Sequence, residues 1–437
     1  MEQVPPPPAI DAPPLLPPAP EKKSGRRFLA KLLSFCLALF LLDGVVSFAD
    51  DALILLFGTH AISLIRGLIS FGTLVMALGI YLLMGITPTV PKRIFLPIPL
   101  FFLGSMLAMF TLAIFWYHRI EEIAFAVSTG ELMLGVLLVS WSRRENSRMQ
   151  CAGLDSVNLE DGDRRDACPA GKVRQALVQE GQLGARGFSW RNLLGFVALN
   201  VFVLLPLVAI YLFSCGARAV SHFTEGFMAL HPSGFTVQVR KYVRDDGKVI
   251  ELFPMAHVAS ASFYQQVSRS FPTNAVILME GVSDSGNLLT NKITYKRMAQ
   301  TLGLAEQKET FAPNPREVVR ADVDVNVFSR ETIDFLNLIM LFHSRGMTPE
   351  NLTKFLQYSP QPGFEKQLFD DLLVKRNEHL LGEIRTHLQT SDRLMVPWGV
   401  AHMPGLARDI QKEGFHLAET HDFVVIRFGP RGRPPGK

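Results

Sequence analysis

Cysteine is scarce in this sequence, and the few cysteines all lie in its first half. The full set is Cys36, Cys151, Cys168 and Cys215. The C-terminal half therefore has no disulfide and no thiolate, which excludes a cysteine nucleophile and a cysteine metal ligand there. Cys151 and Cys168 also lack the Cys-x-x-Cys spacing of a zinc site.

Several sequence signatures of common enzymes and binding proteins are missing as well. There is no Gly-x-Ser-x-Gly, no phosphate-cradling glycine loop and no His-Glu-x-x-His, which argues against a serine hydrolase and a P-loop enzyme. The net charge is only +4, and the basic residues flank apolar runs. Without a basic stripe interleaved with aromatic residues, the sequence predicts no nucleic-acid partner.

Long apolar runs dominate the first half of the chain. Hydrophobic residues make up 48% of the sequence and the mean hydropathy is +0.20, which indicates a membrane part joined to a soluble part. Leu53–Ile65 is too short to span a bilayer and is expected either to be an interfacial helix that contacts membrane lipid or to pack as a hairpin partner. Five segments reach the roughly 20 residues that a span needs, namely Phe28–Phe48, Gly67–Ile86, Ile94–Tyr117, Ile120–Trp141 and Asn192–Cys215.

Basic residues are distributed unevenly around these spans. They precede the first span, separate the second from the third and follow the fourth, whereas the alternate loops hold only Arg66 and Arg119. By the positive-inside rule the N-terminus is cytoplasmic, and five spans put the chain after Cys215 on the opposite side. We expect a multi-pass protein of a bacterial inner membrane with an extracytoplasmic C-terminal domain.

Three segments are predicted to be disordered. Residues 1–27 form a proline-rich cytoplasmic arm that cannot be helical, either a solvated tail or a ligand for a proline-reading module. Residues 142–191 form a polar cytoplasmic loop, and residues 429–437 a short tail. The four spans and the interfacial helix then occupy 28–141, and the fifth span 192–215.

Two carboxylates interrupt the apolar spans. Asp43 and Glu131 would lie at bilayer depth, where an ionisable residue is costly and marks either a polar contact between helices or a proton or ion path. Neither has a basic partner at helical spacing. The pattern therefore favours packing between helices over transport.

Residues 234–428 have the size of one domain. The segments 234–243 and 248–258 alternate apolar and polar residues around the turn "RDDG", which predicts a β-hairpin. A buried strand, "NAVILMEGV", follows, then helices with apolar spacing of three and four, and then the strands "RLMVPWGVAH" and "HDFVVIRF". The fold class predicted is an α-helical membrane bundle plus a C-terminal α+β domain.

Three of these predicted strands end on residues that can bind a metal. His257, Glu280 and His402 each close a strand, and the ends of strands in open α/β sheets gather ligand groups. Two imidazoles and a carboxylate form a common set for a catalytic divalent ion. Asp322 and Asp324, in "RADVDV", are either a further oxygen site or a turn followed by a strand.

Four segments carry a resemblance to a known family. "FPMAHVAS", "VILMEGVSD", "LLVKRNEHLLGEI" and "LMVPWGVAHMPGLARDIQKEGFHL" occur in this order, and the domain resembles the TraB/PrgY/GumN family, to which the Tiki proteases belong. That family's site has two Gly-x-x-His motifs, a glutamate between them and an Arg-Asn pair on a helix. The first motif departs from the family at Pro254, where the family has glycine.

The resemblance implies a metal-dependent peptidase. His257, Glu280 and His402 would hold a divalent metal ion, and Glu280, Arg376 and Asn377 would be the catalytic group. The substrate would be a peptide or a protein N-terminus outside the cytoplasm. The alternative is a domain that binds or sequesters a peptide without cleaving it.

Overall fold

The computed structural model describes residues 23–157, 176–184, 187–290, 295–314, 317–346 and 348–429. The chain divides into two compact units, Met1–Ile210 and Tyr211–Lys437. Most of the predicted proline-rich arm, the centre of the predicted loop and nearly all of the predicted tail lie outside these residues. Each unit is described by itself below.

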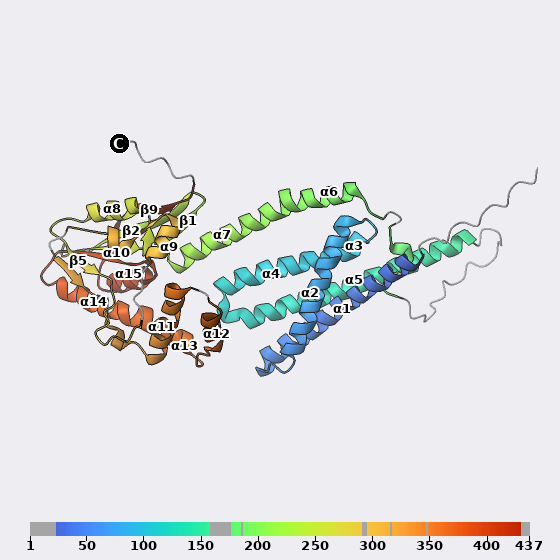
Figure 1. The fold of residues 1–437 in the computed structure, drawn as a ribbon, viewed down its shortest axis with the longest axis horizontal. Helices are drawn as coiled ribbons and strands as arrows, with labels where there is room; N and C mark the ends of the chain where they lie inside the picture. Colours follow the sequence, from blue (N-terminus) through green and yellow to red (C-terminus); the bar gives the residue numbers. More distant parts are fainter. Residues whose placement is uncertain are drawn as a thin grey trace, which may run out of the picture. The chain divides into compact units, whose positions relative to one another are not determined.

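The first unit is built from long apolar helices (Figure 1). By length and composition, the described residues contain five helices that can cross a membrane, which fits a multi-pass membrane protein. The helices of the first four spans are α1 (Lys23–Phe57), α2 (Ser63–Ile86), α3 (Lys92–Phe95), α4 (Pro97–Phe115) and α5 (Ile120–Val157).

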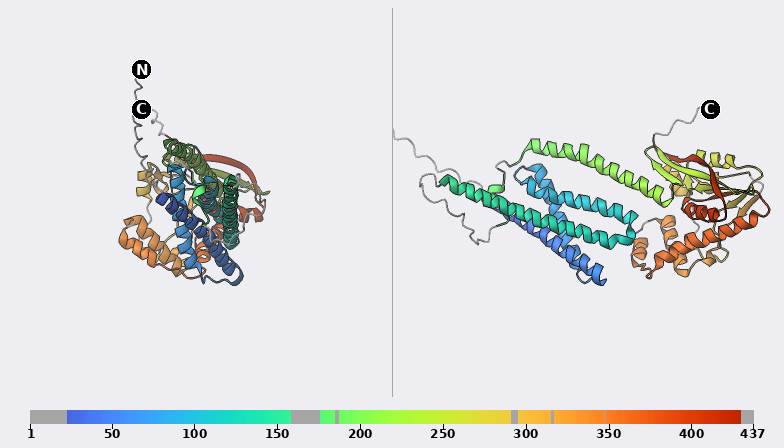
Figure 2. Two further views of the ribbon diagram at one scale, coloured as in Figure 1. Left: turned by 90° about the vertical axis from the view of Figure 1, so that its right-hand side faces the viewer. Right: turned by 180° about the vertical axis from the view of Figure 1, so that it is seen from behind.

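Helices α1 and α5 run side by side (Figure 2). A Cβ atom added at Gly44 would lie 2.9 Å from the backbone of Leu132, and one at Gly135 would lie 3.2 Å from the Cα of Leu41. Small residues at such crossings let two membrane helices approach closely. Apolar side chains are buried around this contact, among them Leu37 of α1 and Leu138 of α5.

The fifth predicted span is one continuous helical stretch. It begins with α6 (Trp190–Leu199), passes through a π-helical segment, Asn200–Leu204, and continues as α7 (Leu205–Phe223). The helical stretch is longer than the predicted 192–215 at both ends. Ser189 caps it, because its side chain accepts a hydrogen bond from the backbone N–H of Asn192.

Two predictions for the membrane half are wrong. Leu53–Ile65 is not a separate interfacial helix, because α1 continues to Phe57 and α2 begins at Ser63. The loop predicted from residue 142 does not start there, since α5 extends to Val157. Its last part is ordered: Val178 is buried against the bundle and its N–H donates to Ser34 Oγ at 2.9 Å.

The second unit holds a mixed seven-stranded sheet. One edge of β2 pairs antiparallel with β9, and its other edge pairs with β1 and then β3. From β3 onward the order β3, β8, β5, β7 is parallel. The strands are β1 (Met228–His231), β2 (Gly234–Val243), β3 (Val249–Met255), β5 (Val276–Met279), β7 (Glu317–Arg320), β8 (Arg393–Gly399) and β9 (His416–Arg427).

Short helices and a two-stranded pair complete the unit. The small pair consists of β4 (Val258–Ala259) and β6 (Ala305–Glu306). The helices are α8 (Ala261–Ser270), α9 (Lys296–Leu302), α10 (Gln307–Thr310), α11 (Arg330–Arg345), α12 (Pro349–Gln357), α13 (Phe364–Phe369), α14 (Lys375–His387) and α15 (Met403–Lys412). A π-helical segment, Asp370–Val374, joins α13 to α14.

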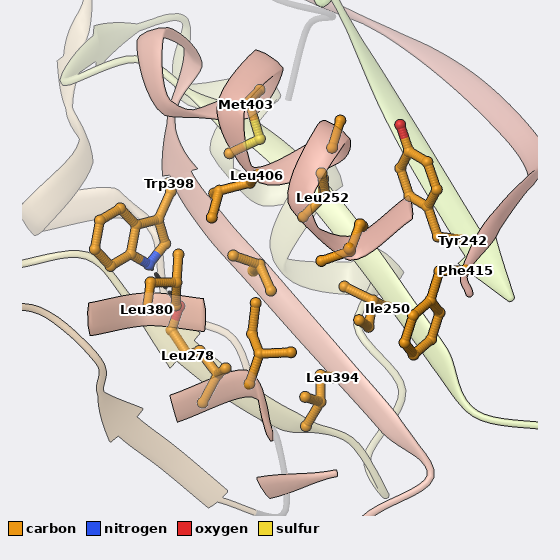
Figure 3. Close-up of a cluster of buried hydrophobic side chains, with 14 of the residues drawn as sticks. Tyr242, Ile250, Leu252, Leu278, Leu380, Leu394, Trp398, Met403, Leu406 and Phe415 are labelled. Carbon is orange, nitrogen blue, oxygen red and sulfur yellow. Dashed lines mark hydrogen bonds between the residues drawn. The ribbon is translucent and has the colours of Figure 1, made fainter. Parts of the chain in front are cut away.

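Helices cover both faces of this sheet (Figure 1). Successive side chains of a strand point to opposite faces, so Leu252 packs in a cluster with α14 and α15, whereas Phe253 packs in a second cluster with α8. Figure 3 shows the first cluster, in which Leu380 and Leu406 cover Leu278 and its neighbours. A strand buried on both faces reads as a continuous apolar run, as in β5 and β8.

The structure differs from two sequence-based predictions in this unit. The sheet begins before residue 234, because β1 pairs with β2. His257, Glu280 and His402 do not close their strands but follow them at a short distance, because β3 ends at Met255, β5 at Met279 and β8 at Gly399. Strands β5 and β8 correspond to the predicted strands "NAVILMEGV" and "RLMVPWGVAH", and the predicted turn between β2 and β3 is present.

Candidate active site

A cleft lies where the parallel strands end. The residues that follow β3, β5 and β8 all reach it, since parallel strands present their carboxyl ends at one edge of a sheet. The cleft has a volume of about 680 Å³. It is lined by Met255, Ala256, His257, Glu280, Glu365, Leu368, Phe369, Leu372, Leu373, Arg376, Gly399, Val400, Ala401 and His402. Four of the five predicted site residues are thus brought together, and Asn377 is not in the lining.

A buried ion-pair network forms one part of the site. Arg376 of α14 donates from Nε and Nη2 to the two carboxylate oxygens of Asp322, at 3.0 and 2.7 Å, and from Nη2 to Glu280 Oε1 at 2.8 Å. The Asp322 side chain is fully buried and the other two are about nine-tenths buried. Charges taken out of water require such paired geometry, so this guanidinium joins β5 to the loop after β7.

Backbone donors hold the two carboxylates in place. Glu280 Oε2 accepts the N–H of Gly399 at 2.6 Å, and Asp322 accepts the N–H of Gly281 at 2.9 Å. Both oxygens of Glu280 therefore have partners. The network carries two negative charges and one positive charge, so its net charge is negative.

His402 is held in one orientation by Asn377. Its Nδ1 lies 2.7 Å from Asn377 Oδ1, while Asn377 Nδ2 lies 3.4 Å from the carbonyl oxygen of His402. The amide oxygen only accepts, so Nδ1 carries the proton and Nε2 has a free lone pair. Burial, and then the positive charge of Arg376, lower the pKa of His402 to about 4. The imidazole is neutral at pH 7.

Trp398 contacts both His402 and Arg376. Its indole N–H donates to the carbonyl of Leu278 at 3.0 Å, which ties β8 to β5. Its ring meets the His402 ring edge to face at 5.1 Å, and the Arg376 guanidinium lies 5.3 Å from its centre. The indole thus fixes the position of both polar side chains.

His257 lines the same cleft and stacks on an aromatic ring. Its ring lies parallel to that of Tyr295, with 4.9 Å between the centres, and its carbonyl accepts the N–H of Gln307. Burial, and then the carboxylates of Glu280 and Glu306, raise the pKa of Tyr295. The phenol is therefore neutral at pH 7.

Two groups that could bind a metal lie close together in the cleft. His402 Nε2 and Glu280 Oε1 lie 3.8 Å apart, and both present electron pairs. A histidine whose other nitrogen is held by an amide oxygen is the usual arrangement around a metal. A third ligand is not in place, however, because no group of three such donors in the described ranges is positioned to hold an ion.

Several contacts could not be read from the sequence motifs. Asp322 is a partner of Arg376. The feature of the sequence that could have indicated this contact is the position of Asp322 shortly after a strand, at the same edge of the sheet as Glu280. Asp324 instead accepts the N–H groups of Ser285 and Asn326, so it holds a loop. Pro254 does not interrupt β3, in which it pairs with Trp398.

The comparisons with known proteins give no relative for this arrangement. No family model, no curated protein and no solved structure matches the chain.

Proposed function

We propose that the protein is a membrane-anchored peptidase of the TraB/Tiki type, whose cleft acts on peptides outside the cytoplasm. The observation that carries the proposal is the convergence of His257, Glu280, Arg376 and His402 on one cleft. These residues are up to 145 positions apart in the sequence, yet they line one cleft. A chance set of polar residues would not be expected to share one cleft.

The residues predicted from the sequence and the apolar residues of the cleft have the following proposed roles. His257, Glu280 and His402 would hold a divalent ion, which would polarise a peptide carbonyl. Asn377 is a positioning residue, because it fixes the tautomer and orientation of His402. Leu368, Phe369 and Leu372 form an apolar wall that suits the side chains of a peptide.

Arg376 is the candidate for stabilising negative charge on a reacting peptide. It lines the cleft, and the groups that it contacts are carboxylates and a carbonyl. A guanidinium held by a buried carboxylate is pre-organised, which is the requirement for electrostatic stabilisation of a transition state. Asp322 supplies that support.

A second candidate is a domain that binds a peptide without cleaving it. It is favoured by the engagement of both Glu280 oxygens, one with Arg376 and one with the N–H of Gly399. In this case the ion-pair network is structural and the apolar wall supplies the affinity.

The two candidates differ in metal dependence and product. The full-length protein in detergent would be stripped with a chelator, resupplied with Zn²⁺, Mn²⁺ or Co²⁺ in turn, and incubated with a mixture of peptides analysed by mass spectrometry. We expect cleavage with metal only, its loss in His402→Ala and its retention in His387→Ala, whose histidine contacts Glu383 on α14. Peptide binding without cleavage under every condition would support the second candidate, and neither activity would overturn both.

A further inference from the structure

The membrane unit contains a cluster of buried charges that anchoring does not require. Asp43, Asp50 and Asp51 of α1 and Glu131 of α5 are at least 94% buried. Among the residues that the structure describes, the basic side chain that pairs with this cluster is Arg66 of α2. Four carboxyl groups therefore face one guanidinium inside the helical bundle, where an unpaired charge is expensive.

Arg66 is occupied by two of these carboxylates. Its Nη1 donates to Asp50 Oδ2 at 3.3 Å and to Asp51 Oδ1 at short range. Ser63 donates a further hydrogen bond to Asp50 at 2.9 Å. The guanidinium at this end of the cluster is thus taken up by Asp50 and Asp51.

Asp43 and Glu131 form the other part of the cluster, and they face each other. Asp43 Oδ1 accepts the hydroxyl groups of Ser70, at 2.6 Å, and Ser47, at 3.4 Å. Asp43 Oδ2 and Glu131 Oε1 are both buried and have no hydrogen-bond donor in the part of the chain that the structure describes. The two carboxyl groups nevertheless lie within hydrogen-bonding reach of one another.

Two ionised carboxylates cannot remain in such contact away from water. Their repulsion is unscreened in the helical bundle, and a shared proton converts it into a hydrogen bond. The hydroxyl donors on Asp43 stabilise its ionised form, so the proton belongs on Glu131 and is donated toward Asp43 Oδ2.

The backbones of α1 and α5 meet at the level of this pair. Gly44, next to Asp43, lies against the backbone of Glu131 and Leu132, where an added Cβ would be 3.2 and 2.9 Å from the nearest atoms. The spacing of α1 and α5 at this level is therefore set by backbone contact. This close packing keeps the two carboxyl groups near one another, where a shared proton removes their repulsion.

We propose that Asp43 and Glu131 form a proton-binding site within the membrane bundle, occupied by one proton at neutral pH. The sequence favours a packing contact between helices at these residues, and the proposal adds a bound proton to that contact. The site gives the bundle a ligand of its own, independent of the peptidase proposal. Asp50, Asp51 and Arg66 form its charged surroundings, and α4 contributes no charged residue.

Infrared spectroscopy of the full-length protein in lipid nanodiscs tests this site, because a protonated carboxylic acid has its own carbonyl band. At pH 7 we expect such a band in the wild type, its loss in Glu131→Gln and its retention in Glu121→Gln, an exposed position on the same helix. Asp43→Asn should shift the band, since Glu131 then has a different hydrogen-bond partner. The amide replacements match the protonated acids in shape, and thermal unfolding checks that the variants are folded.

The wild-type spectrum alone can overturn the proposal, even if a variant fails to fold. Absence of the band at pH 7 would show that no proton is bound. Persistence of the band in folded Glu131→Gln, or an unshifted band in folded Asp43→Asn, would equally contradict the assignment. Stabilisation by sodium chloride but not by choline chloride, with no acid band, would identify a sodium site in its place.

Discussion

At the scale of single residues, Arg376 is the side chain on which the site most depends for stability. Replacing it with methionine would leave the Asp322 and Glu280 carboxylates buried without their cation. Removal of one partner from a buried ion pair typically costs about 3–5 kcal/mol. We expect Arg376→Met to lower the free energy of unfolding by an amount in that range, as measured by denaturation of the full-length protein.

The same helix supplies a matched control for this prediction. Arg385 pairs with Glu413, but its side chain is 60% exposed, and exposed ion pairs contribute only about 0–1 kcal/mol. Arg385→Met should therefore unfold almost as the wild type does. An equal loss of unfolding free energy in the two variants would mean that the Arg376 network contributes no more to stability than an exposed ion pair.

The pKa of His402 predicts a pH dependence of stability. The pKa is about 4 in the folded protein against 6.5 for the free side chain, so the unfolded state binds more protons between these values. Stability from this residue is fully present above pH 6.5 and is lost as the pH falls toward 4. The loss amounts to about 1.4 kcal/mol per pH unit within that window.

A comparison with His402→Gln isolates this contribution. Glutamine cannot titrate, so the variant's free energy of unfolding should fall less steeply than that of the wild type between pH 6.5 and 4, without divalent ions present. If the free energy of unfolding fell in parallel for the two proteins, His402 would not have different pKa values in the folded and unfolded states.

The residues that line the cleft could be predicted from the sequence better than their contacts. His257, Glu280, Arg376 and His402 stand in recognisable motifs, and a motif is a local property of the chain. The partner of Arg376 is 54 positions away and depends on which strands are neighbours in the sheet. The stacking of His257 on Tyr295 likewise depends on a loop that carries no local signal.

At the scale of elements, the contact between α1 and α5 is limited by backbone at Gly44. Gly44→Ala would place a methyl group 2.9 Å from backbone atoms of Leu132, which cannot move aside as a flexible side chain can. Overpacking of this kind costs about 1–3 kcal/mol. We expect a lower midpoint of thermal unfolding for this variant in detergent.

Gly72→Ala is the control for the Gly44 variant. Gly72 lies in α2, and an added Cβ there meets no atom within 4 Å. Alanine also has the higher helix propensity, so this variant should unfold at or above the wild-type temperature. A similar loss of stability in both variants would indicate that the α1 and α5 contact is not the cause.

The elements themselves were predictable to different degrees. Spans longer than about 20 apolar residues are strong signals, and each predicted span corresponds to a helix. The end of α1 was missed because its last turns contain Asp50 and Asp51, which pair with Arg66 of α2 and so extend the helix beyond the apolar run. The sheet order could not be predicted, because β8 enters between β3 and β5 from far along the chain.

At the scale of the whole molecule, the distribution of basic residues leads us to propose a cytoplasmic N-terminus and an extracytoplasmic second unit. Alkaline phosphatase is active only outside the cytoplasm. A fusion after Lys437 should therefore be active, whereas a fusion within the predicted cytoplasmic loop at 158–175 should be inactive. The opposite pattern, at equal expression, would reverse the orientation and remove the cleft from extracytoplasmic peptides.

The proposed activity rests on whether the cleft binds a divalent ion, and calorimetric titration of Zn²⁺ or Mn²⁺ into the metal-free full-length protein measures this directly. We predict one site per chain, weakened by more than about 100-fold in His257→Ala and in His402→Ala, with each variant still folded. His387→Ala should bind as the wild type does. If the wild type binds no ion, or if both cleft variants bind it unchanged, the cleft is not a metal site and the metallopeptidase proposal is wrong.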